Sequence, residues 1–121
     1  PSYAKKAIEI GIDGIVVSNH GGRVLDTLVT TMDILPKIVE VVDNKIPILL
    51  DGGITRGTDI LKALAFGASA VMIGKPIMYG LATAGALGVA HSLKILKDEL
   101  EISMALTGCK TLKDINKDIL F

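Results

Sequence analysis

The fold of this chain is decided by a segment that occurs twice. Residues 7–17 read AIEIGIDGIVV, and 56 residues later residues 63–73 read ALAFGASAVMI. Each copy ends a helical pattern at a glycine and continues into a short apolar run, which is typical of a buried parallel strand. A repeated unit of helix, glycine and strand favours consecutive βα units, and such repeats suit a barrel better than an open sheet.

The remaining chain continues the same alternation of helix and strand. A third apolar run follows Asn44, so we predict three parallel strands at 14–18, 46–50 and 69–73. Apolar residues at helical spacing predict crossover helices between these strands. The fold class is therefore α/β with parallel strands. Three strands cannot close a (β/α)8 barrel, so we expect the chain to be a fragment or to pair with the rest of a barrel.

Charge and cysteine content argue against several classes of site. Thirteen basic and thirteen acidic residues cancel, which leaves no excess charge for nucleic acid or an anionic membrane surface. Cys109 is the single cysteine, which rules out an intrachain disulfide and a multi-cysteine metal site, and we expect no metal. A single cysteine also fits a reducing compartment, and we expect a cytoplasmic protein. No apolar run reaches the roughly 18 residues of a transmembrane helix.

Polar segments follow each of the three predicted strands. They are SNHGGR at 18–23, DGGITR at 51–56 and GKP at 74–76. Ligands of parallel α/β folds lie at the carboxyl ends of the strands, so we expect these segments to form one site.

The first segment places an imidazole three residues before a guanidinium. His20 can act as a general base near neutral pH, and Arg23 can grip a carboxylate with two hydrogen bonds. Taken alone, His20 would be a histidine that satisfies loop backbone groups, and Arg23 a solvated arginine. Their spacing across two glycines at a strand end favours chemistry at the carbon next to a carboxyl group.

The second and third segments predict an anion site. Glycine loops beside a helix N-terminus direct N–H groups at phosphate, and Lys75 adds a positive charge. The carboxylate of Asp51 cannot hold phosphate, so it accepts from a ligand hydroxyl or fixes its own loop. Asp-Gly-Gly also makes ordinary turns, and only its combination with Gly74 and Lys75 favours phosphate.

Several other conspicuous residues have structural interpretations. We expect His91 on the solvated face of the last helix and Cys109 in packing contacts. The Gly/Ala-rich stretch at 80–90 predicts close helix packing. The methionines occupy positions typical of a core: Met32, Met72, Met78 and Met104.

From about residue 7 to residue 106 the chain resembles the FMN-dependent 2-hydroxy-acid oxidase and dehydrogenase family. The most specific part is SNHGGR at 18–23 with the Leu25-Asp26 and Asp33-x-Leu35-Pro36 that follow it. The DGG segment and the residues after it also occur in other FMN or phosphate-binding barrels. The resemblance implies that residues 1–121 are the C-terminal half of a TIM barrel domain that oxidises a small L-2-hydroxy acid, of the lactate or glycolate type.

The resemblance also implies roles for individual residues. His20 would be the catalytic base and would contact the substrate, and Arg23 would bind the substrate carboxylate. FMN would be lined by Ser18, Asp51, Gly52, Gly53, Ile54, Thr55, Gly74 and Lys75. The family usually has arginine where this chain has Thr55 and Lys75; lysine keeps the charge without the fork, and threonine loses the charge.

The family places further active-site residues in the N-terminal half, which this chain lacks. They include a lysine near the flavin, an aspartate that orients the histidine and tyrosines that hold the substrate. We therefore expect the isolated chain to be inactive, and the complete enzyme to be a homo-oligomer. Two alternatives stay open: a non-catalytic half-barrel or scaffold piece, and another FMN barrel such as a flavin-type isopentenyl diphosphate isomerase. The His20 and Arg23 pair argues against the second.

Overall fold

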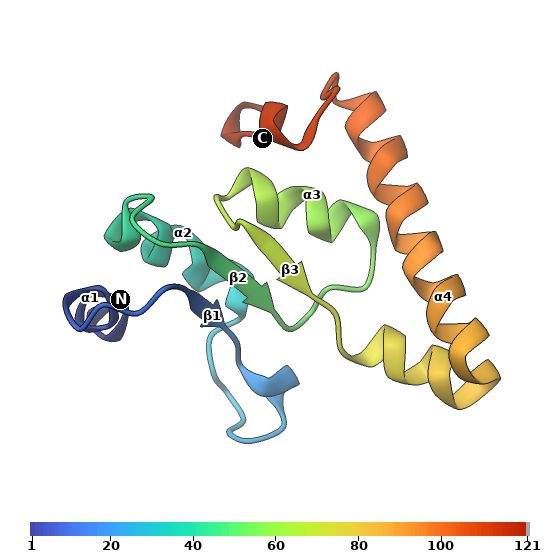
Figure 1. Ribbon diagram of the computed structural model, residues 1–121, viewed down its shortest axis with the longest axis horizontal. Helices are drawn as coiled ribbons and strands as arrows, with labels where there is room; N and C mark the ends of the chain where they lie inside the picture. Colours follow the sequence, from blue (N-terminus) through green and yellow to red (C-terminus); the bar gives the residue numbers. More distant parts are fainter. Residues whose placement is uncertain (121) are drawn as a thin grey trace.

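A computed structural model describes residues 1–120, in which three parallel strands form one sheet (Figure 1). The strands β1 (Ile15–Val17), β2 (Ile48–Asp51) and β3 (Ala70–Met72) lie in the order β1-β2-β3. The prediction of three parallel strands is confirmed; each strand is shorter than predicted, and β2 ends one residue later than predicted, at Asp51. The second strand begins later than expected because Pro47 lacks an N–H, although its carbonyl still accepts from the N–H of Ile15 at 3.0 Å.

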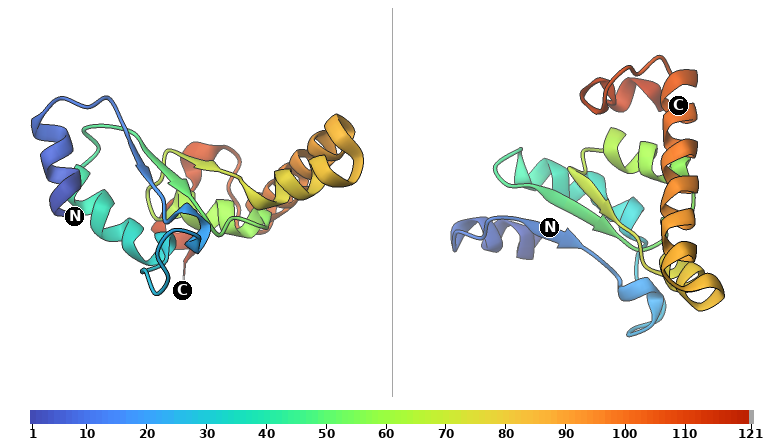
Figure 2. Two further views of the ribbon diagram at one scale, coloured as in Figure 1. Left: turned by 90° about the horizontal axis from the view of Figure 1, so that it is seen from below. Right: turned by 45° about the vertical axis from the view of Figure 1, so that its right-hand side comes forward.

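Four α-helices follow one another from left to right in Figure 1. They are α1 (Ser2–Glu9), α2 (Thr31–Val42), α3 (Gly57–Ala65) and α4 (Lys75–Leu106). Short 3₁₀ turns complete the chain: η1 (His20–Gly22), η2 (Leu112–Asp114) and η3 (Lys117–Ile119). Helices α2 and α3 are the crossovers between successive parallel strands, and α3 packs against α4 (Figure 2).

One face of the sheet is buried and the other is open. Ile48 and Leu50 of β2 are buried against the helices together with Leu35 of α2. On the opposite face Val16 is 52% exposed and Met72 is 44% exposed. A sheet of three strands with an uncovered apolar face is consistent with part of a larger barrel.

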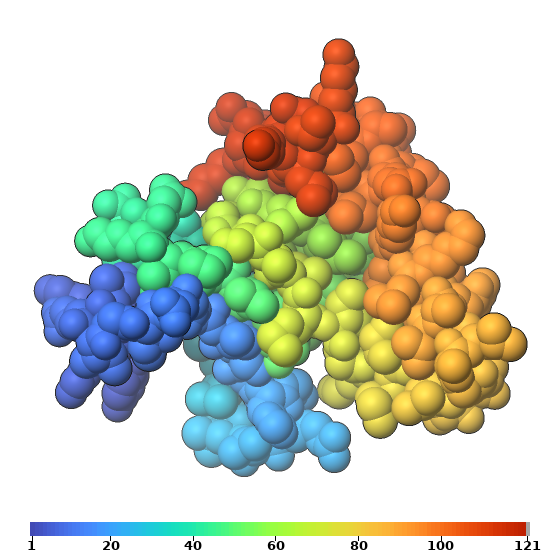
Figure 3. Space-filling view, viewed as in Figure 1, coloured from blue at the N-terminus to red at the C-terminus, as the bar shows by residue number. Residues whose placement is uncertain are grey.

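The segment between β1 and α2 projects from the body of the molecule (Figure 3). Residues 23–30 of this segment are all exposed. At its start the N–H of Gly21 in η1 donates to the Asn19 side chain at 3.1 Å, and at its end Thr30 caps α2 by accepting from the N–H of Asp33 at 3.2 Å. Side-chain hydrogen bonds therefore hold both ends of the projecting part.

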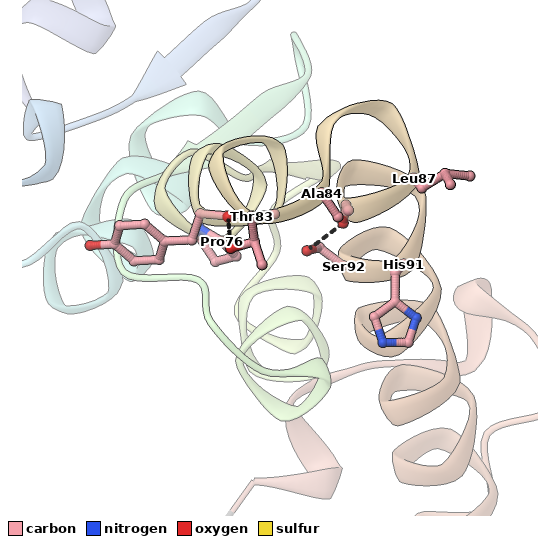
Figure 4. A pocket seen from close by; sticks show the side chains of 9 residues that line it. Pro76, Thr83, Ala84, Leu87, His91 and Ser92 are labelled. Atoms are coloured by element: carbon pink, nitrogen blue, oxygen red, sulfur yellow. Dashed lines mark hydrogen bonds between the residues drawn. The ribbon is translucent and has the colours of Figure 1, made fainter.

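Helix α4 contains a kink that confirms the predicted close packing. Ala84 and Gly85 have non-helical backbone angles, and a Cβ built on either Gly80 or Gly88 would collide with the backbone of the other. The hydroxyl of Ser92 donates to the carbonyl of Gly88 at 2.9 Å beside a shallow hollow in the kink (Figure 4). Only glycine lets the two arms of α4, the parts before and after the kink, approach this closely.

The remaining structural expectations have mixed outcomes. His91 is exposed and Cys109 is buried, as expected. The core assignment is wrong for Met72 and Met78, which are 44% and 60% exposed. No helix within residues 1–120 has the length and apolar character to cross a membrane. Over the same residues, no group of three or more potential ligand side chains is placed to hold a metal ion.

Candidate active site

The carboxyl ends of the three strands bring the three polar segments together. The hydroxyl of Ser18, after β1, donates to the Asp51 carboxylate at the end of β2, at 2.5 Å. The hydroxyl of Thr31 donates to the carbonyl of Gly52 at 3.1 Å, and the ammonium of Lys75 donates to the carbonyl of Gly21 at 3.3 Å. The expectation that the segments meet at one edge is confirmed, because side chains join each of them to another.

The backbone around His20 is unusual. His20, Gly21 and Gly22 have φ values of 56°, 67° and 73°, so three consecutive residues lie in the left-handed region. For histidine this conformation costs roughly 1 kcal/mol, and it persists only where neighbouring groups hold it.

Two polar side chains supply part of that restraint. The His20 N–H donates to the Ser18 hydroxyl at 3.0 Å, and the Gly21 N–H donates to the Asn19 side chain at 3.1 Å. Ser18 thus accepts from the histidine backbone while it donates to Asp51. This chain of bonds fixes the start of the His20 loop relative to β2.

A cavity of about 740 Å³ lies at this edge of the sheet. This volume is within the range of small-molecule sites. Nine of the ten predicted site residues line it: His20, Arg23, Asp51, Gly52, Gly53, Ile54, Thr55, Gly74 and Lys75. The tenth, Ser18, does not line the cavity and acts through its hydrogen bond to Asp51.

The cavity has an end that fits a phosphate group. A Cβ built on Gly53 or Gly74 would meet no atom within 4 Å, so open space borders the backbone at both glycines. Lys75 is the first residue of α4, and the ammonium-bearing Lys62 of α3 also lines the cavity. Glycine backbone, a helix N-terminus and two cationic side chains together suit a bound dianion.

Gly52 has a different role from its neighbours. Its φ is 97°, and a Cβ at this position would lie 2.7 Å from the Asn19 side-chain oxygen. The loop after β2 therefore needs glycine here to pack against the loop after β1. Gly52 shapes the site by permitting this close approach.

Thr55 is bound to Asp59 in α3. The Asp59 carboxylate accepts from the Thr55 N–H at 3.0 Å, the Thr55 hydroxyl at 3.3 Å and the Arg56 N–H at 3.0 Å. These bonds cap the start of α3. Arg56 does not line the cavity, so the positive charge near its phosphate end comes from the lysines.

Several lining residues were not identified from the sequence. The side chain of Met72 in β3 lies on the open face of the sheet, and Met78 lies in the first turns of α4 beside the cavity. Helical or strand spacing alone gave the methionines a core interpretation. The signal was their position within three residues of the Gly74-Lys75 segment, where a strand ends and a helix begins.

The chain matches a known protein family over its full length. The family model described as FMN-dependent dehydrogenase matches residues 1–121. The chain belongs to the FMN-dependent dehydrogenase family.

Members of this family are similar to the chain along its whole length. A 2-hydroxyacid oxidase of Dictyostelium discoideum is 54% identical over 121 residues, which are 100% of this chain and 31% of that protein. An L-lactate oxidase of Nostoc sp. is 54% identical over 117 residues, covering 97% of this chain and 32% of that protein. The chain therefore spans about a third of the length of these curated relatives.

A solved family structure confirms the fold class. The structure of mandelate oxidase with 3,3-difluoro-2-hydroxy-3-phenylpropionic acid superposes with a TM-score of 0.92 at 45% identity. The match covers 96% of this chain and 35% of that one. The three βα units are thus part of a TIM barrel, as the helix–strand alternation predicted.

Proposed function

We propose that the chain is the C-terminal part of an FMN-dependent enzyme that oxidises a small L-2-hydroxy acid, of the lactate or glycolate type, to the 2-oxo acid. One observation carries the proposal: His20 and Arg23 share a single cavity with a phosphate-compatible end. The names of the relatives, 2-hydroxyacid oxidase and L-lactate oxidase, support this substrate class.

At one end of the cavity, the loops after β2 and β3 would hold the FMN cofactor. Gly53 and Gly74 would present backbone N–H groups to the FMN phosphate, and Lys75 would add a point charge. The Asp51 carboxylate already accepts from Ser18, and its remaining lone pairs can accept from a ribityl hydroxyl. When bound, FMN supplies the acceptor for the two electrons that leave the substrate.

The substrate end would use the two residues of the His20 loop. The guanidinium of Arg23 would grip the substrate carboxylate with two parallel hydrogen bonds and so orient the neighbouring carbon. The imidazole of His20 would take a proton from the substrate as its electrons leave. Both residues are on one loop, so a single backbone conformation sets the distance between the base and the clamp.

The test is anaerobic stopped-flow reduction of the flavin in the complete enzyme, with lactate and glycolate as substrates. His20→Gln keeps size and hydrogen bonding but removes the base, so flavin reduction should fall at least about 10²-fold with little loss of binding. Arg23→Lys keeps the charge but loses the fork, so both binding and rate should suffer. Reduction of the flavin by His20→Gln within a few-fold of the parent rate would refute the proposal.

The partners and the location of the complete enzyme are further parts of the proposal. We expect the rest of the barrel to supply the orienting aspartate and the tyrosines, and the complete enzyme to be a homo-oligomer. A cytoplasmic location stays a prediction from the single cysteine, whereas a relative from Arabidopsis thaliana is named peroxisomal. Fluorescence microscopy of the tagged complete protein with a peroxisomal marker separates the two locations.

A further inference from the structure

Lys75 joins the two ends of the candidate active site. Its ammonium donates to the carbonyl of Gly21 at 3.3 Å, although the two residues are 54 positions apart. Gly21 follows His20 directly, and Lys75 begins α4 at the phosphate-compatible end of the cavity. Among residues 1–120, this is the one hydrogen bond that links the loop after β1 to the start of α4.

The backbone of the His20 loop leaves room for this contact. Gly21 has φ of 67°, and a Cβ built on it would point at the lysine side chain, 3.6 Å from Cε and 3.8 Å from Nζ. The other hydrogen bonds of this turn come from its N-terminal side, through Ser18 and Asn19. The Lys75 ammonium is therefore the hydrogen-bond donor that restrains this turn from outside the loop after β1.

Nearby carboxylates are bound elsewhere. Asp51 accepts from Ser18, and Asp59 accepts from the N–H groups at the start of α3. The ion pairs between residues 1 and 120 both lie within α4, more than one turn beyond the kink. An ammonium has three donors, so Lys75 can bind the Gly21 carbonyl and still direct two donors at an anion.

We infer that Lys75 is a positioning residue that holds the Gly21 carbonyl and thereby the loop that carries His20 and Arg23. Through the same ammonium, occupancy of the phosphate end restrains that loop further. The restraint on the loop is inferred from the hydrogen bond between Lys75 and Gly21 alone. The dependence on phosphate rests on the proposed function.

Hydrogen exchange of the complete protein tests both parts. The reporter is a peptide over residues 19–24, whose amides of Gly21 and Gly22 are hydrogen-bonded in the turn. In the FMN-free protein, Lys75→Met removes the donor, and we expect this peptide to exchange about three- to ten-fold faster. Lys75→Arg restores a charged donor, and we expect exchange within about two-fold of the parent.

A matched control removes a charge from the same cavity without removing the contact. Lys62→Met deletes the other lining ammonium, which has no hydrogen bond to the His20 loop, and should leave exchange of the 19–24 peptide within about two-fold of the parent. A peptide over residues 35–42 of α2 serves as the internal reference for global unfolding. Where Lys75→Met unfolds the protein, Lys75→Gln takes its place in the comparison.

Saturating FMN then tests the coupling, with binding followed separately by quenching of flavin fluorescence. We expect FMN to slow exchange of the 19–24 peptide in the parent and to slow it less in Lys75→Met. If Lys75→Met exchanges like the parent without FMN, Lys75 does not hold the loop and the inference is wrong. If FMN binds but protects parent and variant equally, the coupling is wrong. Failure of the parent to bind FMN refutes the proposed function and the coupling, and the FMN-free comparison still decides the restraint.

Discussion

The start of α3 depends on a carboxylate from α4, and removing it should destabilise the protein. The N–H of Gly57, the first residue of α3, donates to the Glu99 side chain at 2.6 Å across 42 residues of sequence. Gly57 is buried, and a Cβ on it would collide with the backbone of Leu100, so the two helices are in direct contact here. Glu99→Ala therefore leaves a buried helix N–H without its acceptor.

The magnitude follows from two effects of that carboxylate. A buried donor left unsatisfied costs about 1–3 kcal/mol, and a negative charge at a helix N-terminus contributes about 0.3–1 kcal/mol. We expect Glu99→Ala to lower the free energy of unfolding by about 2–3 kcal/mol. Glu99→Gln keeps an acceptor oxygen and loses only the charge, so it should cost about 1 kcal/mol.

Glu101 provides a matched control on the same helix. Its carboxylate lies 3.6 Å from Lys97, and both side chains are more than half exposed. Such a surface pair contributes little, so Glu101→Ala should change stability by about 0.5 kcal/mol or less. Urea unfolding of the complete protein, with native-state exchange of the first turn of α3, measures all three variants. If Glu99→Ala and Glu101→Ala lower the free energy of unfolding equally, the Glu99 carboxylate does not stabilise the start of α3.

Three other predictions concern different parts of the chain. Gly88→Ala should force the arms of α4 apart at Gly80 and cost about 1–3 kcal/mol in urea unfolding, and an unchanged midpoint would contradict the close packing. The Asp114 carboxyl accepts hydrogen bonds from the Thr111 backbone N–H, which has the larger effect, and from the Thr111 hydroxyl. Both bonds hold the pKa of Asp114 below its ordinary value. The turn η2 is therefore stabilised above that ordinary pKa and loses this stabilisation as the pH falls, and Thr111→Val should raise the Asp114 pKa in a carboxyl NMR titration. The 121-residue chain by itself should bind FMN weakly at best in a fluorescence titration, because it presents only part of the pocket, and tight stoichiometric binding would contradict this.

Local sequence patterns predicted the elements and the edge of the sheet where the site lies. Short β-branched or apolar runs set the three strands, because such runs are too short for helices and too apolar for loops. Parallel strands place their carboxyl ends together, so the sequence alone assigns SNHGGR, DGGITR and GKP to one site. The methionines show the limit of this reasoning, since Met72 and Met78 fit a core pattern but face the cavity.

The sequence by itself therefore determined the order of helices and strands, the parallel α/β class and the residues at the strand ends. Periodicity and glycine positions are local properties, and they carry this information without knowledge of distant residues. Only the tertiary structure decided which of those residues touch: Ser18 with Asp51, Lys75 with Gly21, and Glu99 with Gly57. These pairs are 33 to 54 residues apart, and their contacts depend on how the helices and loops pack around the sheet, which no local pattern encodes.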